Sequence, residues 1–202
     1  LYSDLNLLLV KQMIETKTSK KLDQFTNEIY SELGISKIGY NPLKWTSIEN
    51  VMPTEVDNFF RKDTIKGYVH DEAAAIFGGV SGNAGLFANA ESIAVICKML
   101  MNNGTYKGKE ILKANVVREF TDSPLAKSGI YRGLGFDKRK PDEFFTKDDF
   151  GHTCFTGTFF FMNRNTNRFL IILTNRVNPT RTNRLMYKDD FSAKIWKQIN
   201  KF

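Results

Sequence analysis

Apolar residues recur at helical spacing in the first part of the chain. Segment 3–15, SDLNLLLVKQMIE, is apolar enough to form a buried helix, with Ser3 or Asp4 placed to cap its first turn. A stripe with spacings of three and four runs through segment 19–34 and consists of Leu22, Phe25, Ile29 and Leu33. Gly34 follows it as a stop signal. The pattern therefore predicts two helices, the second amphipathic.

The middle of the chain alternates between weak and strong periodicity. Segment 35–88 is rich in Gly and Pro signals and is expected to be irregular, with short helices at most. Helical spacing resumes in segment 89–104, with Asn89 as a cap and Gly104 as an end. Segment 112–122 predicts another, shorter helix.

Aromatic and β-branched residues dominate the last third of the chain. Segments 131–137, 151–163 and 168–177 are interpreted as consecutive antiparallel strands, and NRNTN at 163–167 is interpreted as the turn between the last two. Segment 189–202 predicts a terminal helix that packs on the sheet through one stripe, formed by Phe191, Ile195, Ile199 and Phe202. Helices followed by a small sheet and a covering helix indicate the α+β class.

Length and composition are consistent with one globular domain. The chain has 202 residues, of which 42% are hydrophobic, enough for a substantial core. We expect a mainly helical region over 1–125, and antiparallel strands with a C-terminal helix over 126–202. The longest apolar runs, at 7–10 and 169–173, fall far short of the roughly 20 residues of a membrane span.

Charge and cysteine content favour no special partner class. The net charge is +7, but the Lys and Arg residues are dispersed and the densest cluster is KRK at 138–140. We interpret this as a solvated basic surface and expect no nucleic-acid partner. Cys97 and Cys154 form no CxxC pair, so neither a zinc site nor a disulfide framework is indicated.

Two clusters of side chains carry potential chemistry. HDE at 70–72 offers three potential metal ligands, but adjacent side chains diverge, and an ordinary hydrogen-bonded loop is the alternative. His152 and Cys154 lie two residues apart in a predicted strand, so their side chains point to one face, as a Cys/His hydrolase would require. No third group that would orient the pair is evident from the sequence.

The Gly-rich stretch GGVSGNAG at 78–85 resembles a phosphate-binding loop only superficially. It lacks the Lys-Ser/Thr of a P-loop, and Asn83 stands where a GxSxG nucleophile elbow requires Gly. Glycines that let a tight turn approach another backbone are the alternative interpretation.

Two elements in order carry a family resemblance: YSDLNLLL at 2–9 and FGHTCFTGT at 150–158. The chain resembles the C-terminal part of β-lactamase-type serine hydrolases, which include class C β-lactamases, penicillin-binding proteins and related esterases. Their Tyr-x-Asn element and Lys-Thr-Gly or His-Thr-Gly strand flank the active site. Segment 53–94 is similar to envelope-associated members, some of which carry this domain after a family 3 glycoside hydrolase of the β-N-acetylglucosaminidase kind. The resemblance implies a β-lactamase/transpeptidase-like fold with an incomplete sheet.

The resemblance assigns catalytic roles to Tyr2 and His152. Tyr2 would assist proton transfer, and His152 would stand where the family often has Lys, offering a hydrogen bond or positive charge. No cofactor and no metal are implied.

Substrate-binding roles follow for Asp4, Thr153, Cys154 and Phe155. Asp4 replaces the usual Asn, and Cys154 replaces a Gly. Thr153 would donate its hydroxyl, with His152 and Thr153 both facing the substrate. A backbone N–H near Cys154 or Phe155 would form half of an oxyanion hole.

The family nucleophile belongs to a Ser-x-x-Lys motif, and no serine of this chain has a lysine three residues on. We therefore expect the motif to lie upstream, in a missing N-terminal part of the same protein, and this chain to be inactive alone. The implied reaction is acyl transfer on an amide or ester, with a cell-wall peptide or β-lactam as substrate, in the periplasm or cell envelope. The alternative is a catalytically dead binding or interaction domain.

Overall fold

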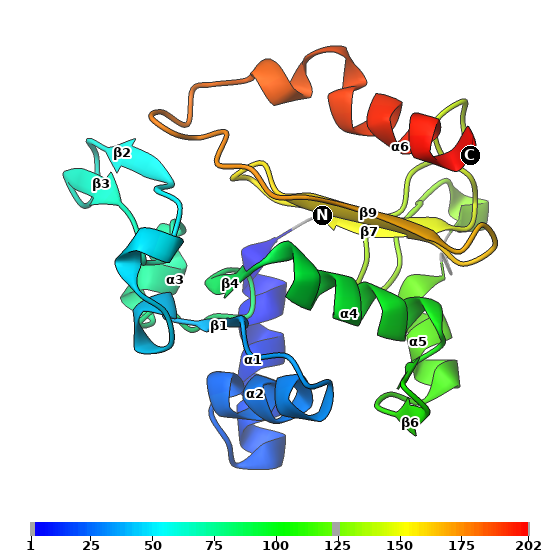
Figure 1. The fold of residues 1–202 in the computed structure, drawn as a ribbon, viewed down its shortest axis with the longest axis horizontal. Coiled ribbons are helices and arrows are strands. Elements are labelled where there is room, and N and C mark those ends of the chain that lie inside the picture. The colour runs from blue at the N-terminus through cyan, green and yellow to red at the C-terminus, as the bar shows by residue number, and fades with distance from the viewer. Residues whose placement is uncertain (1–2, 123–125, 202) are drawn as a thin grey trace. The chain divides into compact units, whose positions relative to one another are not determined.

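The computed structural model describes residues 3–122 and 126–201, apart from the side chains of 189 and 190. The chain divides into two compact units. One comprises Leu1–Ser92 with Val177–Arg181, and the other comprises Ile93–Arg176 with Thr182–Phe202. Figure 1 labels the elements of both units.

The first helix of the first unit is α1, Asp4–Thr18, and it begins as predicted. The Ser3 hydroxyl accepts a hydrogen bond from the Leu5 N–H at 3.3 Å. The expected burial is wrong, because no described residue of α1 is buried and a stripe of Leu5, Leu9 and Met13 is 64–69% exposed. The sequence shows which helix residues are apolar. Such residues become buried only where another surface covers them, and the described residues supply no such surface.

Helix α2, Leu22–Glu32, confirms the second prediction. Leu22 and Leu33 are buried at the two ends of the stripe, and Gly34 follows with a φ of +70°. That left-handed conformation is the one a glycine adopts without steric cost at a helix end. The Glu15 side chain of α1 accepts a hydrogen bond from the Leu22 N–H at 3.0 Å, which ties the two helices together.

The segment predicted to be irregular contains short elements. Its helices are the 3-10 turns Pro42–Lys44 and Ile48–Asn50 and the α-helix α3, Glu72–Ile76. Its strands form two antiparallel pairs, β1 (Ile38–Tyr40) with β4 (Leu86–Ala88) and β2 (Glu55–Asp57) with β3 (Asp63–Ile65). The short helices were predicted and the strands were not, because three residues are too few to display an alternating pattern.

A buried carboxylate holds distant parts of the first unit together. Glu55 is 3% exposed, and its Oε2 lies 2.7 Å from both His70 Nε2 and Arg181 Nη2. Arg181 also bonds Glu72 at 2.9 Å. Burial acts to raise the pKa of Glu55, but the hydrogen bonds from Arg181 and His70 outweigh it and lower the pKa to about 2. The HDE stretch is therefore part of a hydrogen-bonded loop.

Helix α4, Ala90–Met101, has the predicted limits. Asn89 accepts a hydrogen bond from the Ser92 N–H at 3.0 Å, and Gly104 follows with a φ of +92°. The second unit continues with the hairpin of β5 (Thr105–Tyr106) and β6 (Lys109–Glu110), then α5 (Ala114–Thr121) where a short helix was predicted. A 3-10 turn, Ala126–Ser128, follows.

The second unit is built on a three-stranded antiparallel sheet in the order β7–β8–β9. The strands are β7 (Asp149–Thr153), β8 (Phe159–Asn163) and β9 (Arg168–Ile172). The prediction of one strand over 151–163 is wrong, because the chain turns back at 154–158 and forms a hairpin. The predicted turn at 163–167 is confirmed.

The strand predicted over 131–137 is also wrong. Only isolated bridges occur there, Arg132 with Asp137 and Asp137 with Gly151. The Gly133 N–H bonds the Phe136 carbonyl at 3.0 Å, so the segment folds back on itself. A Cβ on Gly133 would collide with the Phe120 carbonyl, which explains why glycine stands there.

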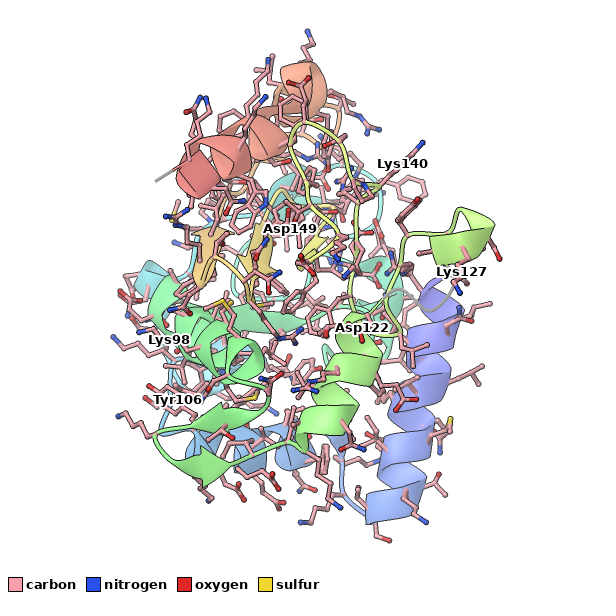
Figure 2. The ribbon with its side chains drawn as sticks, turned by 90° about the vertical axis from the view of Figure 1, so that its right-hand side faces the viewer. Lys98, Tyr106, Asp122, Lys127, Lys140 and Asp149 are labelled. Carbon is pink, nitrogen blue, oxygen red and sulfur yellow. The ribbon has the colours of Figure 1, made fainter. Side chains whose placement is uncertain are left out.

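Side-chain hydrogen bonds fix the register at the far end of the β7–β8 ladder. Asp149 and Asn163 are paired in register, both are buried, and the Asn163 amide donates to Asp149. Asn163 Oδ1 accepts hydrogen bonds from the Asn165 and Thr166 N–H groups, which shapes the turn into β9. Figure 2 shows Asp149 among the strands of the sheet and Asp122 at the end of α5.

Helix α6, Phe191–Lys201, packs on one face of the sheet, as predicted, after the 3-10 helix Leu185–Asp190 (Figure 1). The buried cluster on this face consists of Phe145, Phe159, Phe161, Ala193 and Trp196. The predicted stripe is only partly right. The buried residues of the helix are Ala193 and Trp196, which were not in the predicted stripe, whereas Ile195 is half-buried, Ile199 packs at the margin of the cluster and Phe191 is 43% exposed. Phe202 lies outside the described residues.

The opposite face of the sheet is covered by α4 and α5. Phe150 and Met162 are buried there, and the Arg164 guanidinium lies 4.5 Å from the centre of the Phe150 ring. Arg164 also donates to the Leu100 carbonyl of α4 at 3.4 Å. A sheet between helices, preceded by a helical unit, confirms the α+β class. Of the helices in the described residues, none has both the length and the apolarity of a membrane span.

Replacing Glu55 by Gln is expected to destabilise the first unit in a pH-dependent way. The folded-state pKa of Glu55 is lowered, so its stabilising contribution is present above the unfolded pKa and is lost as pH falls from about 4.5 to 2. Glu55→Gln should cost about 3 kcal/mol at neutral pH, and the difference should shrink below about pH 4.5.

Urea unfolding followed by Trp45 fluorescence, in a Trp196→Phe background, measures this effect. The control is Glu28→Gln, which breaks an exposed ion pair with Lys20 and should cost less than about 1 kcal/mol. An equal loss in both variants, or a Glu55→Gln cost that does not change with pH, contradicts the prediction.

Replacing Trp196 by Ala should destabilise the second unit by about 3–5 kcal/mol, because Trp196 is fully buried and its removal leaves a cavity in the core. Trp196→Phe should cost less than about 2 kcal/mol. The indole N–H has no hydrogen-bond partner among the described residues, so removing this buried donor is favourable and offsets part of the free energy lost with the smaller side chain. Thermal unfolding by circular dichroism measures both, with the exposed Lys194→Ala as control. A cost of Trp196→Ala near that of Lys194→Ala would refute the packing account.

Candidate active site

Four predicted site residues lie in or just after the edge strand β7. His152 and Thr153 belong to the strand, and Cys154 and Phe155 follow it directly. β8 pairs with one side of β7, and on the other side Gly151 exchanges two hydrogen bonds with Asp137, at 2.8 and 3.0 Å. Backbone groups alternate in direction along a strand. Since the N–H and C=O of Gly151 point away from β8, those of Thr153 also point to this outer edge.

His152 and Thr153 share the strand but not a face. Thr153 is in register with Phe159, whose side chain lies in the cluster under α6, whereas His152 is in register with Phe160. Consecutive strand side chains point to opposite faces. The two side chains therefore project from opposite faces of β7, and the outer edge of the strand is what the two residues have in common.

The His152 ring is held by a hydrogen bond, since Nδ1 lies 2.9 Å from the Thr153 carbonyl oxygen. The neighbouring Cys154 side chain is the main reason why the pKa of His152 is raised above its ordinary value, against burial, which lowers it. A raised pKa increases the share of the cationic form near neutral pH.

The turn after β7 is fixed by backbone hydrogen bonds. The Cys154 N–H donates to the Thr158 carbonyl at 2.8 Å, and the Gly157 N–H donates to the Cys154 carbonyl at 3.1 Å. Gly157 has a φ of +101°, and an added Cβ would lie 2.5 Å from Thr174 Oγ1. Of the two predicted oxyanion-hole donors, the Cys154 N–H belongs to the ladder with β8, which leaves Phe155 as the candidate.

Arg176 anchors this turn and was missed by the sequence analysis. Its side chain is 5% exposed, and Nε donates to the Phe155 carbonyl at 3.0 Å and to the Tyr187 hydroxyl at 3.2 Å. The guanidinium also donates to the Asn183 carbonyl and lies 4.6 Å from the centre of the Tyr187 ring. A lone Arg after an apolar strand, as in FLIILTNRV, is the signal that could have identified it.

The remaining predicted residues belong to the first unit. Asp4 is the first residue of α1 and is exposed, while Tyr2 lies outside the described residues. The Gly-rich loop approaches α1, since a Cβ on Gly82 would collide with the Leu7 carbonyl. Asn83 donates to Asp71 at 3.3 Å, so the loop is held in place. This confirms the interpretation of the glycines as a means of close backbone approach.

Solved structures show the same fold. A beta-lactamase from Mycobacterium bovis superimposes with a TM-score of 0.57 over 100% of this chain and 62% of that one, at 16% identity. A penicillin-binding protein homolog from Caulobacter crescentus gives a TM-score of 0.56 over 94% of this chain and 56% of that one, also at 16% identity. The fold is therefore β-lactamase/transpeptidase-like.

Sequence comparison identifies the family. The family model described as Beta-lactamase matches residues 1–193, so the chain belongs to the beta-lactamase family. It is 32% identical over 196 residues to the Escherichia coli K12 protein named "Putative D-alanyl-D-alanine carboxypeptidase", covering 87% of this chain and 45% of that protein. It is 30% identical over 193 residues to the Bacillus subtilis 168 protein named "N-acetylmuramyl-L-alanine amidase", covering 87% and 44%. The chain thus spans about half the length of these relatives.

Replacing Arg176 by Lys should loosen the turn at 154–158, because lysine lacks the planar fork that reaches several acceptors at once. We expect the Cys154 and Gly157 amides to exchange with solvent about tenfold faster or more, and the second unit to lose roughly 2 kcal/mol of stability. The control is Arg184→Lys, since Arg184 is exposed and its guanidinium lies 5.9 Å from the Tyr187 ring. Hydrogen exchange measured by NMR checks this, and unchanged protection of both amides would contradict the anchoring role.

Proposed function

We propose that this chain supplies part of the active site of a β-lactamase-type serine hydrolase, which acts by acyl transfer on an amide or ester. The observation that carries the proposal is the outer edge of β7, where Thr153 presents its backbone groups and the following turn is held by Arg176. Membership of the beta-lactamase family supports the reaction class.

The nucleophile in this proposal is the Ser of a Ser-x-x-Lys motif, supplied by residues outside this chain. The Ser attacks the carbonyl of the substrate, an acyl-enzyme forms, and water releases the acyl group. By itself the chain is inactive in this scheme, because no serine within it has a lysine three residues on.

The residues of this chain take up charge and protons around that carbonyl. The Phe155 N–H forms half of the oxyanion hole, where one backbone donor contributes about 3 kcal/mol to the transition state. His152, with its raised pKa, presents positive charge, and the Thr153 hydroxyl binds the substrate. Tyr2 assists proton transfer and Asp4 contacts the substrate, as the family pattern implies.

The substrate class that we propose is a cell-wall peptide or a β-lactam. The names of two relatives refer to D-alanyl-D-alanine and N-acetylmuramyl-L-alanine bonds, which occur in bacterial cell walls. The site of action would be the periplasm or cell envelope, and a preceding family 3 glycoside hydrolase domain is consistent with the envelope-associated members that segment 53–94 resembles. A catalytically dead binding domain is the alternative, favoured by Asp4 and Cys154 at positions where the family has Asn and Gly.

A serine-reactive fluorophosphonate tests the proposal on the full-length protein. Labelling should occur and should disappear when the Ser of the Ser-x-x-Lys motif is changed to Ala. His152→Ala should slow labelling about 10²-fold, in the range of a lost proton-transfer or charge-stabilising group. The exposed Lys147→Ala, two residues before β7, is the matched control and should label at the normal rate.

His152→Lys restores the residue type that the family often carries and should keep most of the labelling rate. A folded full-length protein that takes up no label would establish the binding-domain alternative instead. Equal labelling of the His152→Ala and Lys147→Ala variants would show that His152 has no role in the reaction.

A further inference from the structure

Two arginines begin and end the short segment 176–181, RVNPTR. The chain leaves the second unit after Arg176, supplies Val177–Arg181 to the first unit and returns to the second unit at Thr182. A residue that holds the end of this segment in the first unit can therefore act on Arg176 through the backbone that joins them.

At its first residue, the segment is bonded to the turn at 154–158. Arg176 Nε donates to the Phe155 carbonyl at 3.0 Å, and the Arg176 backbone N–H donates to the Thr156 carbonyl at 3.0 Å. The Phe155 N–H, which is the proposed oxyanion donor, lies directly before these two carbonyls in the chain. The direction of this N–H therefore depends on the position of Arg176.

At its last residue, the segment is bonded to the buried carboxylate of Glu55. The Arg181 backbone N–H donates to Glu55 Oε1 at 2.8 Å, and the guanidinium donates to both oxygens at 2.7–2.9 Å. Glu72 accepts a further hydrogen bond from Arg181 at 2.9 Å. One residue pair earlier, the Pro179 carbonyl accepts a hydrogen bond from the Val56 N–H at 2.9 Å. Charge-assisted bonds to both oxygens of a carboxylate define position and orientation together.

The residues between the two arginines allow little movement. Val177 is fully buried, and the ring of Pro179 fixes its φ. Because the segment is short and bonded at both ends, a shift at Arg181 is passed on to Arg176. A buried ion pair adds little net stability, since the desolvation of both charges offsets most of their attraction. What the pair with Glu55 provides is one defined position for the segment.

We propose that Arg181 is a positioning residue for the candidate active site. Held by Glu55, it fixes segment 177–181, and through this segment it keeps the Arg176 side chain on the turn that presents the Phe155 N–H. Arg181 touches neither the substrate nor the reacting atoms in this scheme. Its importance for catalysis rests on the proposed function, whereas its hold on the turn does not.

Hydrogen exchange of the folded full-length protein, followed by mass spectrometry, measures this hold. Arg181→Gln removes the charge, and the peptide that contains the turn at 154–158 should exchange about tenfold faster. The turn at 163–167, at the opposite end of β8, should stay within about twofold of the wild-type rate. Arg181→Lys keeps the charge without the planar fork, so exchange at 154–158 should rise about threefold. This milder variant decides the question if Arg181→Gln does not fold.

The matched control is Arg61→Gln, which removes another part-buried arginine of the first unit. The Arg61 guanidinium bonds Asp57 at 3.3 Å and the carbonyls of Val69 and His70 at 2.9 Å, and none of these partners belongs to segment 177–181. The variant should weaken the first unit, yet exchange at 154–158 should stay within about twofold of the wild-type rate. Equal loosening of the turn by Arg61→Gln would indicate general destabilisation and overturn the proposal.

A double-mutant cycle tests whether Arg181 acts through Arg176. In an Arg176→Lys background the connection to the turn is already broken, so adding Arg181→Lys should speed exchange at 154–158 by less than about 1.5-fold. Independent effects would multiply, and the full threefold increase in this background would overturn the proposal.

Fluorophosphonate labelling separates this inference from the proposed function. A looser turn in Arg181→Gln together with labelling that is about tenfold slower supports both. A looser turn with unchanged labelling supports the hold of Arg181 on the turn and contradicts the oxyanion role given to Phe155. Unchanged exchange at 154–158 in folded Arg181→Gln or Arg181→Lys protein overturns the positioning role, whatever the labelling shows.

Discussion

The candidate site depends on one constraint, the tight turn at 154–158 that converts a long aromatic run into a hairpin. Gly157 takes a left-handed φ there, and an added Cβ would lie 2.5 Å from Thr174 Oγ1. The Arg176 guanidinium donates a hydrogen bond to the Phe155 carbonyl, and the Arg176 backbone N–H donates to the Thr156 carbonyl at 3.0 Å. The guanidinium is buried because it satisfies several carbonyls at once, which compensates for its removal from water.

This turn sets what the end of β7 offers to a substrate. Along the edge, Thr153 and then Phe155 present backbone groups that suit a developing oxyanion. His152 lies in the same strand, and its raised pKa favours the positive charge that would assist acyl transfer.

Much of the architecture was predictable because it depends on local signals. Ser3, Asn89 and Gly104 mark helix ends through hydrogen bonds or backbone freedom that act within a few residues. The family motifs also located β7. Features that depend on residues far away in the sequence could not be predicted. Examples are the exposure of the apolar stripe of α1 and the fold-back at Gly133.

The hairpin itself escaped prediction for a physical reason. Aromatic and β-branched residues favour extended structure on both sides of position 154, so the sequence resembles one strand until Gly157 is recognised as a turn. Arg176 escaped because its partners are carbonyls of residues 155 and 183, and carbonyls carry no sequence signal. Tertiary hydrogen bonding, rather than propensity, decides this part of the structure.

The central claim is that the outer edge of β7 stabilises the oxyanion of an acyl-transfer reaction. The most direct measurement is a crystal structure of the full-length protein after reaction with a phosphonate that mimics the tetrahedral intermediate. The account predicts an adduct on the Ser of a Ser-x-x-Lys motif, with a phosphonyl oxygen about 2.7–3.1 Å from the Phe155 backbone nitrogen. An adduct whose phosphonyl oxygens contact no backbone N–H of β7 or its turn would contradict it.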